Sequence, residues 1–98
     1  MMITNSFNTS YTVIGGLSKE VISLRSRCIN ILTSIITCQD KTLLSRLRNE
    51  FNSLEQRILE IYSIATSIKS YSINNNQSID LLIELCSRPI SNNQRFYS

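Results

Sequence analysis

Apolar residues along this chain recur in steps of three and four, the spacing of a helix face that packs on another helix. One row falls within about 18–38 and a second within about 41–71, and a shorter row over about 77–87 ends before Pro89. The rows are Leu17, Val21, Leu24, Cys28, Ile31, Ile35 and Cys38; Leu44, Leu47, Phe51, Leu54, Ile58, Ile61, Ala65 and Ile68; and Ile79, Leu82, Ile83 and Cys86. The pattern predicts an all-α fold, an antiparallel helical hairpin (18–38 and 41–71) with a short third helix (77–87), assembled into a helical bundle.

The hairpin interpretation depends on a turn between the two long rows. The first row is interrupted near Asp40, a residue type suited to cap a new helix. A connection over 39–43 has an ordinary length between antiparallel helices, and it brings Arg27 beside Arg57. The alternative is one continuous helix over 18–71, paired between two chains and about 80 Å long at 1.5 Å per residue.

The two ends of the chain lack the helical pattern. Gly15 and Gly16 are expected to break the chain, so that the first helix starts near Ser18, which can serve as its N-cap. We expect a flexible or docked N-terminal arm over 1–16, a single helical domain over 17–88 and a polar C-terminal tail over 89–98.

The composition argues against catalysis and against a bound metal or cofactor. The chain of 98 residues contains no histidine, seven scattered carboxylates and three cysteines, Cys28, Cys38 and Cys86, with no CxxC spacing. Cysteines at such positions are expected to pack as small apolar side chains. We therefore expect a protein that is not an enzyme and needs no cofactor.

Hydropathy and the N-terminal residues indicate the cellular location. No stretch approaches the roughly 20 consecutive apolar residues that span a bilayer, and residues 1–10 lack the charge and apolar run of a signal peptide. We expect a cytoplasmic protein without a membrane partner.

Apolar side chains outside the main rows indicate a protein partner. A two-helix hairpin cannot bury all of them, so the surplus must contact the third helix, a second copy in a homodimer, or another protein. We predict a non-enzymatic interaction module, such as an adaptor, a small chaperone or an inhibitor. The predicted partner-binding residues are Ile22, Ile29, Ile36, Leu59 and Tyr62. In the alternative interpretation these five residues are ordinary core beneath the third helix.

Basic residues near the predicted turn suggest a second function. The formal net charge is +3, and a small nucleic-acid-binding regulator would use the basic end of the hairpin. The candidate contacts are Arg25, Arg27, Lys41, Arg46 and Arg48. Carboxylates interspersed among them make this the weaker hypothesis.

Overall fold

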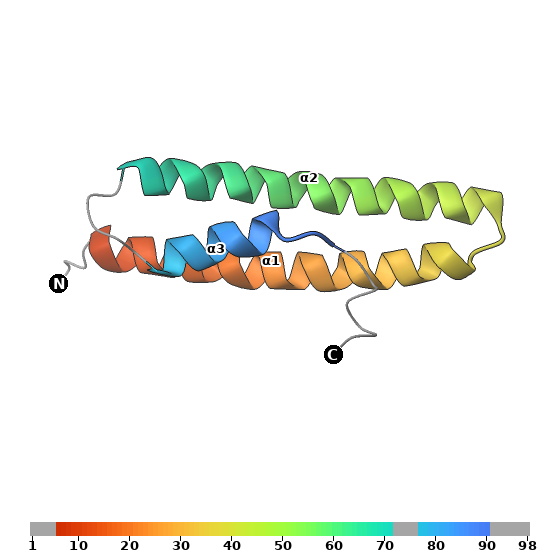
Figure 1. Ribbon diagram of the computed structural model, residues 1–98, viewed down its shortest axis with the longest axis horizontal. Coiled ribbons are helices and arrows are strands. Elements are labelled where there is room, and N and C mark those ends of the chain that lie inside the picture. The colour runs from red at the N-terminus through yellow and green to blue at the C-terminus, as the bar shows by residue number, and fades with distance from the viewer. Residues whose placement is uncertain (1–5, 72–76, 91–98) are drawn as a thin grey trace.

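The computed structural model describes residues 6–71 and 77–90, which form three helices (Figure 1). Helix α1 spans Ser6–Thr37, α2 spans Lys41–Tyr71 and α3 spans Gln77–Ser87. Helices α1 and α2 lie antiparallel as a long hairpin, and α3 packs against both of them. The predicted hairpin with a short third helix is confirmed, and the bounds of α2 and α3 agree with the apolar rows.

The turn of the hairpin is tight and capped. Residues 38–40 connect α1 to α2, and a carboxylate oxygen of Asp40 accepts hydrogen bonds from the backbone N–H groups of Thr42 (2.9 Å) and Leu43 (3.2 Å). This is the N-cap arrangement, which satisfies two of the amides that a helix start leaves unpaired. The continuous-helix alternative is wrong, because the chain reverses here and its longest dimension is 56 Å.

Helix α1 begins at Ser6, well before the predicted start near Ser18. Residues 6–16 are therefore helical, and Gly15 and Gly16 lie inside the helix instead of breaking it. The reason is tertiary: Ile14 continues the apolar row and is 3% exposed in the core. Burial of an isoleucine contributes roughly 1.5–3 kcal/mol, which offsets the combined cost of roughly 2 kcal/mol for two glycines inside a helix. Residues 1–5 lie outside the described residues.

Ion pairs join α1 and α2 along one flank of the core rows. Arg57 of α2 binds Glu20 of α1 (2.6 Å), and Arg27 of α1 binds Glu50 of α2 (3.3 Å). Within α2, Arg57 also binds Glu60 (3.1 Å). The prediction that Arg27 lies beside Arg57 was wrong. The observed turn is shorter than 39–43, so each residue of α1 faces a residue of α2 closer to the turn.

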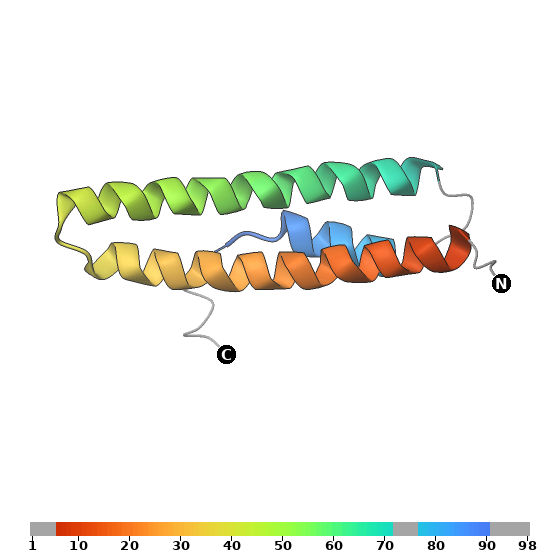
Figure 2. The ribbon, with the colours of Figure 1, turned by 180° about the vertical axis from the view of Figure 1, so that it is seen from behind.

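The core is shared by all three helices, but it is concentrated in the half of the hairpin that α3 covers. Figures 1 and 2 show α3 beside the open end of the hairpin, with only α1 and α2 continuing to the turn. Its residues Ile79, Leu82 and Cys86 are buried between the two long helices. The buried core residues on the long helices are Ile14, Val21, Leu24, Cys28 and Ile31 of α1, and Leu54, Ile58, Ile61 and Ala65 of α2.

Candidate functional site

The half of the hairpin next to the turn carries the same apolar rows without a third helix over them. Beyond Ile31 in α1 and before Leu54 in α2, no apolar side chain is buried. We call the exposed side of this segment the turn-half face. It comprises Ile29, Leu32, Ile35 and Ile36 of α1 and Leu44, Leu47 and Phe51 of α2. All seven side chains are partly or largely exposed, and three of them, Ile35, Leu47 and Phe51, also pack against the core.

The turn-half face continues the surface on which α3 lies. Arg25 of α1 contacts the end of α3, and Leu32 stands one heptad further along the same helix stripe. Gly15 lines a pocket with Ser78 and Leu81 of α3, and its heptad stripe continues through Ile22, which is 57% exposed, to Ile29 and Ile36, so these isoleucines border the groove. The groove that holds α3 therefore extends towards the turn with nothing over it in the part of the chain that the structure describes.

Charged residues of α2 follow the edge of this groove at heptad spacing. Lys69 lies next to α3, where its ammonium binds the carboxylate of Asp80 at 2.7 Å. Glu55 borders the last residues of α3, and Arg48 and Lys41 follow on the same stripe towards the turn. Neither Arg48 nor Lys41 forms an ion pair with any other described residue. In the covered half, the cation Lys69 pairs with a carboxylate of α3. In the uncovered half, Arg48 and Lys41 occupy the same stripe but have no carboxylate partner among the described residues.

Arg25 fixes the end of α3 against α1. It is 9% exposed, and its guanidinium donates hydrogen bonds to the carbonyls of Leu85 (3.0 Å), Arg88 (2.7 Å) and Pro89 (3.0 Å). The Leu85 carbonyl lies in the last turn of α3, where carbonyls have no partner within the helix, and the other two carbonyls belong to residues directly after α3. Burial, followed by the charge of Arg88, lowers the pKa of Arg25 from its ordinary value, but an arginine remains protonated at neutral pH. Arg25 therefore has a structural role and is withdrawn from the surface that a nucleic acid can reach.

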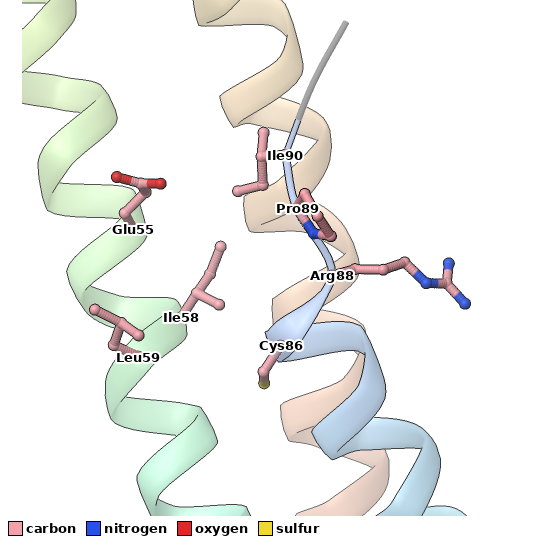
Figure 3. Close-up of a pocket in the computed structure, with 7 residues that line it drawn as sticks. All are labelled: Glu55, Ile58, Leu59, Cys86, Arg88, Pro89 and Ile90. Carbon is pink, nitrogen blue, oxygen red and sulfur yellow. The ribbon is translucent and has the colours of Figure 1, made fainter. Parts of the chain in front are cut away.

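A pocket of about 180 Å³ lies where the covered half meets the turn-half face (Figure 3). Ile58 and Leu59 of α2 line one side, and Cys86 and Ile90 line the other. The guanidinium of Arg88 points away from the pocket, and Arg88 pairs with Glu84 at 3.5 Å. The walls of the pocket are mainly apolar, so the pocket is better suited to bind an apolar side chain of a partner than to carry out a reaction.

The five predicted partner-binding residues are mostly exposed. Ile36 is 67%, Ile22 57%, Leu59 56% and Tyr62 38% exposed, while Ile29 is half-buried. The alternative in which they are core beneath the third helix therefore fails for the four exposed residues. Ile22, Ile29 and Ile36 share one stripe of α1, whereas Leu59 and Tyr62 lie on α2 beside the covered half.

The remaining basic candidates separate into two groups. Arg27 is engaged with Glu50, whereas Lys41, Arg46 and Arg48 are exposed near the turn without an ion pair to another described residue. Of the five candidates, only these three are cations without an ion pair among the described residues, and two of them, Lys41 and Arg48, share one stripe of α2.

Several residues of the turn-half face were assigned to the core by sequence reasoning. Ile35, Leu44, Leu47 and Phe51 occupy core positions of the two rows, yet each is only partly buried. The available signal was length: the third row is far shorter than the other two, so one short helix cannot cover the whole hairpin.

The described cysteines and carboxylates offer no reactive centre. Burial raises the pKa of the Cys28 and Cys86 thiols, which makes them poorer nucleophiles, and Cys38 lies partly exposed beside the turn. Among residues 6–71 and 77–90, no three Cys, Asp or Glu side chains form a group suited to a metal ion. Within the same ranges, no helix is both long enough and apolar enough to cross a membrane.

Comparisons with protein-family models, curated proteins and solved structures found no match for this chain.

Proposed function

We propose that this protein is a non-enzymatic interaction module that binds a helix of a protein partner on its turn-half face. Such a module would serve as an adaptor, a small chaperone or an inhibitor acting in the cytoplasm, as the sequence predicts. The observation that supports the proposal is the incomplete burial of the apolar rows near the turn. Apolar rows that are buried under α3 in one half of the hairpin continue, partly exposed, in the other half.

The apolar surface that these side chains expose provides a driving force for binding. Apolar surface removed from water contributes about 25 cal/mol per Å², and an amphipathic helix laid in a groove is a common way to cover such a surface. The chain itself covers the apolar rows of its other half with one helix, α3. A helix of a partner would pack against α1 and α2 in the turn half, as α3 does in the other half.

The experiment is affinity capture from the native host with quantitative mass spectrometry, comparing the wild type with Ile36→Asp. Ile36 is the most exposed isoleucine of the face, so a charge there disturbs the bound state and leaves the fold intact. Ile22→Asp is the matched control, because Ile22 lies on the same stripe of α1 outside the face and is similarly exposed.

We expect one stoichiometric protein with the wild type and with Ile22→Asp, and its loss with Ile36→Asp at unchanged helicity by circular dichroism. Equal capture by all three baits, or no stoichiometric partner for any of them, would contradict the proposal.

A further inference from the structure

The charged residues beside the turn-half face indicate the chemistry of its partner. We infer that the occupant of this face is an acidic amphipathic helix whose carboxylates pair with Lys41 and Arg48 of α2. This inference rests on the proposed function and specifies the class of partner.

Helix α3 serves as the template for this partner. It places Ile79, Leu82 and Cys86 into the groove, the i, i+3, i+7 spacing of one helix face. On its flank towards α2, Asp80 binds Lys69 at 2.7 Å. A helix that continues this arrangement in the turn half would place its own flank beside Arg48 and Lys41, the next cations on the stripe of Lys69.

The charge balance at the turn favours an acidic partner. Lys41 and Arg48 are exposed there without an ion pair to another described residue, while Asp40 is engaged as the cap of α2. Glu55 stands at the opposite end of the face, beside the pocket. The partner's carboxylates therefore belong at the turn end. Charge complementarity of this kind mainly sets specificity and association rate.

A second copy of the chain fits this face less well. Each copy brings Lys41 and Arg48 to the face against the single carboxylate of Glu55, so two copies face to face present a net charge of the same sign to each other. An acidic helix from another protein avoids that repulsion.

The test is a fluorescence anisotropy titration of the full chain with two stapled helical peptides. Both present leucines at i, i+3, i+4 and i+7; one carries glutamates at its flanking positions and the other carries lysines. We expect the glutamate peptide to bind about tenfold more tightly than the lysine peptide at low ionic strength, with the difference shrinking in high salt.

Three variants localise the interaction. Lys41→Glu combined with Arg48→Glu is expected to reverse the preference in favour of the lysine peptide. Lys19→Glu combined with Arg46→Glu changes the net charge equally at exposed positions off the stripe, and it should leave the preference for glutamate in place. Ile36→Asp should abolish binding of both peptides.

Other outcomes would overturn the inference. If both peptides bind equally and Ile36→Asp abolishes both, the face binds helices without charge selection; the proposed function then stands and only the acidic partner is lost. If neither peptide binds, the inference fails, while the capture experiment still decides the proposed function separately.

Three further results assign the face to a different occupant and likewise overturn the inference. The first is a dimer in light scattering that Ile36→Asp converts to a monomer. The second is displacement of the peptide by a DNA or RNA oligonucleotide. The third is a gain in affinity when Phe96→Ser and Tyr97→Ser are introduced together, which would assign the face to the chain's own C-terminal segment.

Discussion

Gly15 and Gly16 show how a residue with poor helix propensity is tolerated when its neighbour is buried. Apart from the backbone of α1 itself and the two adjacent residues, neither glycine has an atom within 4 Å of the position that a Cβ would occupy, so an added methyl group meets open space. Alanine at these positions also removes backbone freedom from the unfolded chain, which is the usual origin of the glycine cost.

We therefore predict that Gly15→Ala and Gly16→Ala each stabilise the protein by about 0.5–1 kcal/mol. Urea denaturation followed by circular dichroism measures the effect, and the two increments should be close to additive. A neutral or destabilising result at both sites would mean that residues 6–16 are not helical in solution.

Glu20 and Arg57 are the most closely coupled charges between the two long helices. The hydrogen bond from Arg57 lowers the pKa of Glu20 below its usual value of 4.5, partly opposed by desolvation. A carboxylate whose pKa is lower in the folded state stabilises the fold above its unfolded pKa, and that contribution is lost as the pH falls through the folded value.

Glu20→Gln should consequently reduce the thermal midpoint at pH 7, and the difference from the wild type should disappear as the pH is lowered below about 4.5. Melting curves across this range provide the measurement. Glu55→Gln is the control, since Glu55 forms no ion pair within the described residues. A Glu20→Gln effect that persists unchanged into strong acid would exclude the ion pair as its origin.

At the scale of elements, α3 is an 11-residue helix whose position depends on tertiary contacts. A helix this short is marginal in isolation, so its order comes from burial of Ile79, Leu82 and Cys86 and from the guanidinium of Arg25 at its end. Arg25 thereby links α1 to the end of α3.

Arg25→Met should destabilise the protein by about 1–3 kcal/mol, because carbonyls at the end of α3 lose their donor while the apolar side chain still fills the space. Hydrogen exchange should rise most in α3. Arg27→Met is the matched control on the same helix, and its exposed ion pair with Glu50 should contribute less than about 1 kcal/mol. Equal losses for the two variants would contradict the anchoring role of Arg25.

For the molecule as a whole, the exposure of the three thiols differs between the half that α3 covers and the half next to the turn. Cys28 and Cys86 are buried in the half that α3 covers, whereas Cys38 lies at the turn and is only partly buried. Burial raises the pKa of the first two thiols, which further lowers their reactivity at neutral pH.

Alkylation with iodoacetamide under native conditions should therefore modify Cys38 first, and Cys28 and Cys86 only as fast as the bundle opens. Mass spectrometry of timed samples resolves the three sites, and a chaotrope should make their rates converge. Early modification of Cys86 would show that α3 detaches independently of the remaining core.

The sequence alone determined that two long helical segments are followed by a short one, and it favoured a reversal between the first two. The steps of three and four defined α2 and α3, and Asp40 marked the start of α2, because helix periodicity and capping are local properties of the chain. These features follow from residues within a few positions of one another.

Only the tertiary structure decided where α1 begins, which charges pair and which apolar residues are covered. Ile14 extends α1 through two glycines because α3 and α2 bury it, and Arg25, a surface cation by sequence, is drawn inward by the carbonyls at the end of α3. Cys28 and Ile35 occupy equivalent heptad positions in one row, yet Cys28, in the half that α3 covers, is buried and Ile35 is only partly buried. A repeat specifies the side of a helix that packs, whereas the length of the element lying against it sets how much of that side is buried.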